Sequence, residues 1–381
     1  MLRSFTSSAR VHRRLPTSLR RWTHRTGSRT ILATALMWFW AGTLSPSVAV
    51  SQTFATVDVQ MHRETIRAVL LGGGSSTYRL LTSEGALRDV PKADVKIVHR
   101  DEAFEPMSAT ALRNRLQSEF GRHYEVVATQ NFLVVVPRGS SRRWTDLFEQ
   151  SHRGFLSYVR ARGVRVRQGR FPMVAVVYRD TQSFTRHLAE SGLPTSGSIA
   201  GLYSIGSNRV ATTQRLPAGE TIKTIRHEAA HQSAYNVGVH SRMNDTPDWI
   251  AEGLASMFEP SAMTDARGAT RRSDRINRDA IEAIKSIDVA TTARIVRELI
   301  RDDARFGDRR RVATAYDVSW AMMFYLGERM PERFAAILRR TAGRPWDEAY
   351  TARQRQQDFS AIIDSDVDRF AASMHRWITS L

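Results

Sequence analysis

Residues 224–232 read Thr-Ile-Arg-His-Glu-Ala-Ala-His-Gln, and the interpretation of the whole chain starts from this stretch. An α-helix has about 3.6 residues per turn, so His227 and His231 lie about 40° apart around its axis and project from one face. Glu228 lies about 100° from His227, where it can hold a water molecule without binding a metal itself. Apart from Glu228 and Arg226, the neighbouring residues are uncharged, which suits a helix in the floor of a cleft. The stretch predicts a metal site built on His227 and His231; the alternative is two incidental histidines on a polar face.

A third ligand is expected downstream, because a catalytic zinc ion typically takes three protein ligands and keeps one position for water. The chain has no cysteine, so the site must use histidine and carboxylate side chains. Pro247 suits the first turn of a helix, and Glu252 follows it among the small residues Ala251, Gly253 and Ala255. A carboxylate in such packed surroundings needs a partner. We therefore predict Glu252 as the third ligand and Zn²⁺ as the ion; the alternative is an exposed helix carboxylate.

The two motifs together resemble the gluzincin class of zinc metallopeptidases. In that class His-Glu-x-x-His is followed downstream by Trp-x-x-Glu-Gly-x-Ala, which is the pattern of residues 249–255. The resemblance implies a zincin-like core, with His227, His231 and Glu252 as zinc ligands and Glu228 as the general base. The order of the expected elements is also similar to that of exported peptidase-MA-like proteins.

Some features of that class lie outside the two motifs. Several gluzincins carry an aspartate four residues after the ligand glutamate, which orients a ligand histidine, whereas this chain has Ser256 there. The class also uses a tyrosine or histidine to stabilise the oxyanion. Tyr316, at the head of an expected helix, is the first candidate and His240 the second, although either residue type more often serves packing. The hairpin that ends near Val210 and Ala211 resembles the edge strand beside the substrate cleft of the class.

Hydrophobic patterning divides the chain after residue 52 into three parts. Residues 53–103 show short alternating stretches with glycine-rich turns, typical of a small β-barrel-like module or a small sandwich. Residues 110–265 mix helical spacing with apolar strands and contain both motifs, so we predict the catalytic core there. Residues 266–381 are almost entirely helical in pattern and are expected to form a C-terminal subdomain. The predicted fold class is α+β: a mixed sheet with active-site helices, a helical C-terminal region and an N-terminal β module.

The first 52 residues have the features of a signal peptide or an N-terminal anchor. A basic stretch leads into an apolar run at residues 31–42, and small residues follow, with a fitting cleavage position after Ala49. The run is shorter than the roughly 20 residues that a membrane span needs. We expect an exported protein, periplasmic or extracellular. The alternative is a membrane-anchored one, held through residues 30–44 if the leader is not cleaved.

The net charge of +18 would fit a nucleic-acid-binding protein, but its distribution argues against one. The first 30 residues carry eight arginines and no acid, so the rest of the chain has a charge of about +10 in which acidic and basic residues alternate. We therefore predict no nucleic-acid partner.

These patterns predict an exported zinc-dependent metallohydrolase, and within that class a peptidase acting on a peptide or protein substrate. One alternative is a catalytically inactive zincin-fold binding or scaffold protein at the cell envelope. Another is a zinc hydrolase acting on a non-peptide amide, because bond preference depends on the shape of the cleft rather than on the motif.

Overall fold

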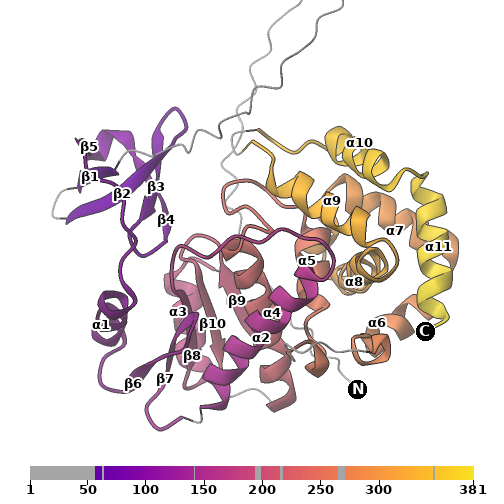
Figure 1. Cartoon of the computed structure of the whole chain (residues 1–381), viewed down its shortest axis with the longest axis horizontal. Helices are drawn as coiled ribbons and strands as arrows, with labels where there is room; N and C mark the ends of the chain where they lie inside the picture. Colours follow the sequence, from indigo (N-terminus) through magenta and orange to yellow (C-terminus); the bar gives the residue numbers. More distant parts are fainter. Residues whose placement is uncertain are drawn as a thin grey trace, which may run out of the picture.

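The computed structural model describes residues 56–61, 64–140, 142–193, 199–214, 218–264, 271–345 and 348–381. These residues form two five-stranded sheets and eleven α-helices, which confirms the predicted α+β class (Figure 1). The expected leader, residues 1–52, lies outside the described residues. None of the described helices is long and apolar enough to cross a membrane.

The N-terminal module is one antiparallel sheet. Its strands are β1 (Thr56–Met61), β2 (Glu64–Gly72), β3 (Thr77–Thr82), β4 (Leu87–Pro91) and β5 (Val95–Arg100), in the order β4-β3-β2-β1-β5. Alternate side chains such as Val57, Val59 and Leu80 are buried on one face, as the two-residue period of a strand dictates. The described strands do not close into a barrel, because β4 and β5 stay at opposite edges. The prediction of a barrel-like module is therefore wrong in this respect.

The second sheet is mixed, as predicted. It is the central element of the region that contains both motifs. Its strands are β6 (Tyr124–Ala128), β7 (Phe132–Pro137), β8 (Met173–Tyr178), β9 (Gly201–Ser204) and β10 (Arg209–Thr213), in the order β6-β7-β8-β10-β9. Strands β7, β8 and β10 are parallel, whereas β6 and β9 run antiparallel at the two edges. Every residue of β7 and β8 is buried, which requires that both faces of the sheet are covered.

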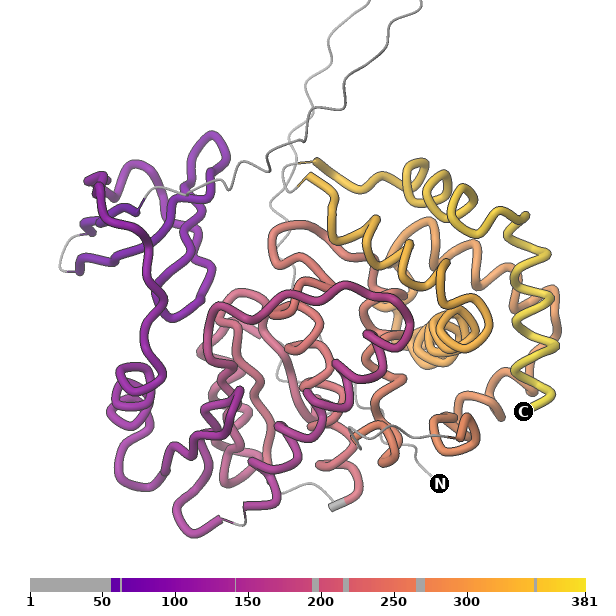
Figure 2. Tube along the Cα trace, in the orientation of Figure 1, coloured from indigo at the N-terminus to yellow at the C-terminus, as the bar shows by residue number. Residues whose placement is uncertain are grey.

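Helices supply that cover. On one face lie α2 (Arg143–Arg160) and α4 (Ala218–Asn236), and on the other lie α1 (Ala109–Phe120) and α3 (Thr181–Glu190). The first face packs Phe132, Phe148 and Ile225 together, and the second packs Val135 with Phe184. Figure 2 shows the same arrangement as a tube along the Cα trace. Helix α4 carries the first motif, so the sheet fixes the position of that helix.

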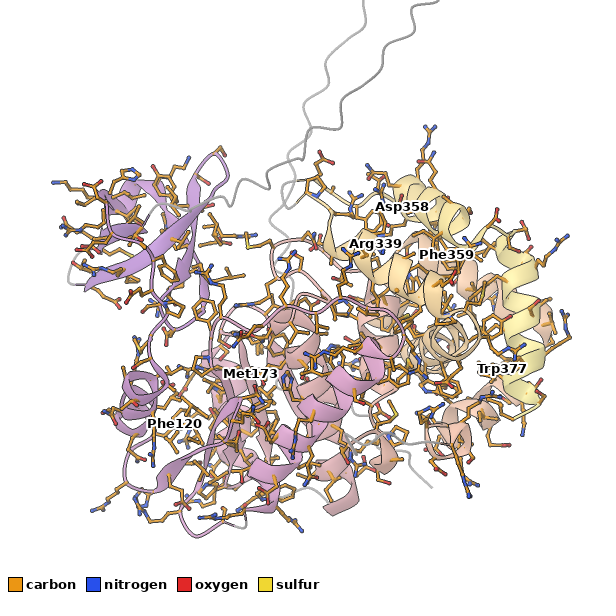
Figure 3. All side chains as sticks on the ribbon, in the orientation of Figure 1. Phe120, Met173, Arg339, Asp358, Phe359 and Trp377 are labelled. Carbon is orange, nitrogen blue, oxygen red and sulfur yellow. The ribbon has the colours of Figure 1, made fainter. Side chains whose placement is uncertain are left out.

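The helical region packs around one buried helix, α8 (Val312–Arg329), against which α5 (Asp248–Ser256) lies. The other helices are α6 (Arg278–Lys285), α7 (Val289–Arg301), α9 (Pro331–Ala342), α10 (Ala352–Ile363) and α11 (Val367–Thr379). Figure 3 labels Trp377 of α11 on the helical side and Met173 of β8 on the sheet side. A Cβ atom on Gly253 would lie 2.4 Å from the carbonyl oxygen of Ser319. Only glycine therefore allows α5 and α8 to approach this closely, and their approach brings the second motif to Tyr316.

Candidate metal centre

Three predicted ligands converge where α4 meets α5. The Nε2 atoms of His227 and His231 are 3.1 Å apart, and they lie 3.2 Å and 3.3 Å from Oε2 of Glu252. Ligand atoms held at tetrahedral angles about 2.0–2.1 Å from one zinc ion would be separated by roughly 3.3 Å. The triangle thus has the size that one tetrahedral ion requires. Within the described residues, these three buried side chains form the group that can hold a metal ion.

Helix geometry explains why the two histidine side chains lie together, and tertiary packing explains why the glutamate lies beside them. His227 and His231 are one turn apart on α4, and their rings meet edge to face with centroids 4.8 Å apart. Glu252 comes from α5, which is buried from Trp249 to Ser256. The side chains of His227, His231 and Glu252 are only 8, 4 and 3% exposed, so an ion there would be largely shielded from solvent.

Glu259, which was not among the residues expected from the sequence, orients His227. Nδ1 of His227 lies 3.0 Å from Oε1 of Glu259, which therefore fixes the tautomer and leaves Nε2 to face Glu252. Glu259 is itself held by Lys223, 3.2 Å away, and Nη1 of Arg226 donates to its carbonyl oxygen at 2.7 Å. Ser256, the position considered from the resemblance, is buried, but the carboxylate comes from three residues further along. A weak signal was available, because Glu259 is the next acidic residue after the ligand glutamate.

The carboxylates around His227 strongly shift the pKa of its ring. Burial alone would lower the pKa of His227, but the carboxylates of Glu252 and Glu259 outweigh it and raise that pKa to about 10. Burial would likewise raise the pKa of Glu252, but the two histidines hold it well below its usual range. A buried cation between two carboxylates is therefore favoured. A divalent ion bound by all three side chains would supply the same positive charge.

Glu228 lies beside the triangle and is oriented by the edge strand. The backbone N–H of Tyr203 on β9 donates to its Oε2 at 2.7 Å. Strand and helix approach closely here, because a Cβ on Gly201 would lie 2.4 Å from Thr224 and 3.2 Å from Cγ of Glu228. Burial raises the pKa of Glu228 to about 7, with His227 opposing the rise and Glu252 adding to it. A carboxylate with such a pKa can both accept and return a proton near neutral pH.

Of the two oxyanion candidates, the structure places only Tyr316 at the triangle. Its ring centroid is 6.4 Å from that of His227, and its hydroxyl hydrogen-bonds to Glu252. Burial raises the pKa of Tyr316 well above its usual value, so the group stays protonated and remains a donor. His240 instead packs beyond the end of α4 against Tyr235, with ring centroids 5.2 Å apart.

Comparison with known proteins gives one match. Residues 221–347 are similar to a family described as "Protein of unknown function (DUF1570)". The matched segment runs from α4 past α9, so it contains the converging ligands, Glu228, Glu259 and Tyr316. The β module and the strands of the second sheet lie before it. A search among curated proteins found no match.

Proposed function

We propose that this protein is a zinc-dependent metallohydrolase of the gluzincin type that cleaves peptide bonds. The observation that carries the proposal is the triangle of Nε2, Nε2 and Oε2 atoms, with the carboxylate of Glu228 beside it. Two histidines and one glutamate are a known ligand set of catalytic zinc sites, and three protein ligands leave a position for water. The absence of cysteine in the chain fits a site of this composition.

The residues divide the chemistry among themselves. When bound, a zinc ion supplies a Lewis acid that polarises a carbonyl group and lowers the pKa of water. Glu228, held through Oε2 by the N–H of Tyr203, accepts the proton of the attacking water and delivers it to the leaving amine. The hydroxyl of Tyr316, which hydrogen-bonds to Glu252, exchanges this bond for one to the oxygen that becomes negative. Glu259 holds the His227 ring in the orientation that binding requires.

The resemblance to gluzincins and the edge strand beside Glu228 support a peptide as the proposed substrate. Strand β9 pairs with β10 on one side and lies at the edge of the described sheet. Its other side can accept an extended peptide as a further strand at the backbone groups other than the Tyr203 N–H, which donates to Glu228. We further propose that the protein acts outside the cytoplasm, on the basis of the basic and apolar leader in the first 52 residues.

The test compares the chain without its leader with its Glu228→Gln variant. Both should retain about one zinc ion per chain, measured by atomic emission after removal of excess metal. Hydrolysis of a mixed peptide library by the variant should be about 10²–10⁴-fold slower, which is the contribution of a positioned acid–base group. Full activity in Glu228→Gln would refute the assignment of the base.

The wild-type chain separates the competing functions. If it binds zinc but cleaves neither peptides nor other amides, the inactive zincin-fold scaffold becomes the better explanation. If it cleaves only non-peptide amides, the site chemistry stands and the substrate class changes. If it binds no zinc on incubation with the metal, the two motifs are structural.

A further inference from the structure

A guanidinium joins the N-terminal module to the strand that orients Glu228. Arg242, in the segment between α4 and α5, donates through Nη1 to the carbonyl of Gly85 at 2.7 Å. Its Nη2 and Nε donate to the carbonyl of Ile205 at 2.6 Å and 3.1 Å, and Nη2 also reaches that of Gly206 at 3.3 Å. Gly85 lies in the β3–β4 turn of the module, whereas Ile205 and Gly206 form the β9–β10 turn. One side chain therefore holds both turns.

The module turn is tied to the hairpin by further contacts. The N–H of Leu87 donates to the carbonyl of Gly206 at 2.7 Å, and Glu84 lies 3.5 Å from Nη2 of Arg209 on β10. Gly85 has a φ of +86°, and a Cβ there would lie 2.8 Å from the ring of Phe171. The β3–β4 turn therefore has a fixed conformation and is closely packed. The carbonyl of Gly85 is in consequence a rigid acceptor for Arg242.

The position of the β9–β10 hairpin determines the position of the N–H group that orients Glu228 at the metal centre. Ile205 follows Tyr203 by two residues, and the Tyr203 N–H holds Oε2 of Glu228 at 2.7 Å. Gln232 of α4 donates to the carbonyl of Asn208 at 2.9 Å, and thereby fixes the β10 side of the turn. On the β9 side, which carries Tyr203, Arg242 holds the carbonyl of Ile205, while the module itself contacts Gly206 in the turn and Arg209 on β10. Strand β9 has four residues and, among the described strands, pairs with β10 alone, so its own ladder gives it little rigidity.

We infer that Arg242 is a positioning residue of the metal centre: together with the β3–β4 turn of the N-terminal module, it fixes the β9–β10 hairpin and so the N–H that orients Glu228. The catalytic consequence rests on the proposed function, but the mechanical link does not. The β module thus has a role in the site although it lies outside the segment with family similarity. Arg242 lies within that segment and its carbonyl partners lie before it.

The experiment compares Arg242→Met with Arg113→Met in the full chain without its leader. Arg113 is a matched control, because its Nε also donates to a carbonyl, that of Val126 on β6 at the other edge of the sheet, at 3.1 Å. Hydrogen exchange of the amides in 201–213 should be on the order of tenfold faster in Arg242→Met. It should be unchanged in the control, and both variants should retain zinc.

Turnover supplies the second measurement. In Arg242→Met we expect kcat to fall on the order of tenfold while KM stays within about twofold, because the base loses its orientation and the substrate surface remains. Arg242→Lys should restore part of kcat, since an ammonium group can still donate to the same carbonyls. A merely structural role would lower the amount of folded protein without this division between kcat and KM.

Each outcome has one meaning. Unchanged exchange at 201–213 in folded Arg242→Met, or equal acceleration in Arg113→Met, would overturn the inference. If the wild-type chain shows no turnover, the proposed function fails, but the exchange comparison still decides whether Arg242 holds the hairpin. If Arg242→Met does not fold, Gly85→Ala displaces the same carbonyl from the module's side, and exchange at 201–213 is measured in that variant with the same expectation.

Discussion

Two buried carboxylates near opposite ends of α8 have different partners. Glu252 lies beside Tyr316 at the start of the helix, and Glu328 lies near its end. Glu328 is 2.5 Å from Nη2 of Arg162 and 2.7 Å from Nη2 of Arg275, and Tyr158 donates to it at 3.0 Å. The corresponding partners of Glu252 are the imidazoles of His227 and His231. In both cases burial would raise the pKa of the carboxylate, and its partners hold the pKa below the usual range.

The two sets of partners differ in what they can do besides donating hydrogen bonds. A guanidinium has five donors and no lone pair, so the Glu328 cluster can only remain an ion pair. An imidazole can give up its proton and present a lone pair to a metal. The same lowered pKa therefore indicates structural pairing at Glu328, whereas at Glu252 it is compatible with a group that could hold a metal ion. Four predictions test this distinction, from the largest effect to the smallest.

The largest effect is expected on zinc affinity in Glu252→Ala. Four-ligand structural zinc sites bind with about 10–16 kcal/mol, so one ligand accounts for roughly 3–4 kcal/mol, or several hundred-fold in the dissociation constant. Competition with a chromophoric chelator would measure it. Glu328→Ala serves as the control and should bind zinc like the wild type. Equal weakening in the two variants would remove the distinction.

The next effect concerns folding stability in Glu328→Ala. Losing this carboxylate leaves Arg162 and Arg275 facing each other with only 14% of each side chain exposed. We expect the free energy of unfolding to fall by about 3 kcal/mol, measured by urea denaturation of the metal-free protein. Added zinc at about 100 times its dissociation constant should still stabilise this variant by about 2.7 kcal/mol. The same addition should leave Glu252→Ala unchanged, and stabilisation of that variant would count against the triad.

A smaller effect is expected from the carboxylate that orients His227. Glu259→Ala removes the acceptor 3.0 Å from Nδ1 but keeps all three ligands. Loss of such an outer partner typically weakens zinc binding 10–100-fold. Glu259→Gln should lose less, because its amide oxygen can still accept the hydrogen bond. Chelator competition again provides the measurement, and unaltered affinity in Glu259→Ala would show that the His227 ring is held by packing alone.

The sequence could predict the parts of the site that local geometry sets. His227, Glu228 and His231 lie within two turns of one helix, so their mutual directions follow from the helical repeat. Glu252 was predictable because it stands in a second recognisable motif on a short helix. The α+β class likewise followed from strand alternation and helical spacing, which depend on the nearest residues along the chain.

The remaining features depend on contacts between distant segments. Glu259 lies three residues beyond the end of α5, so helical spacing does not define its direction. Arg242 meets carbonyl groups of the main chain, which leave no signature in the sequence. Whether the module closes into a barrel depends on whether β4 reaches β5, and the curvature of a whole sheet decides that. Local patterning therefore predicts the elements and the ligands, but not the interactions that orient them.

The last and smallest effect is a pH dependence that separates the two carboxylate clusters. With the pKa of His227 at about 10 in the metal-free site, zinc must displace a proton from it at neutral pH. The apparent affinity should therefore rise about tenfold for each pH unit between pH 7.5 and 9, and level off as the pH passes the raised pKa. Calorimetry at pH 8 in two buffers of different ionisation enthalpy should show release of at least about one proton per zinc bound, the one that leaves His227. Glu328→Ala should give the same slope, because that cluster titrates independently of the site. An affinity that is flat above pH 7.5 would mean that His227 is already neutral before zinc binds, and that Glu252 and Glu259 do not hold it as a cation.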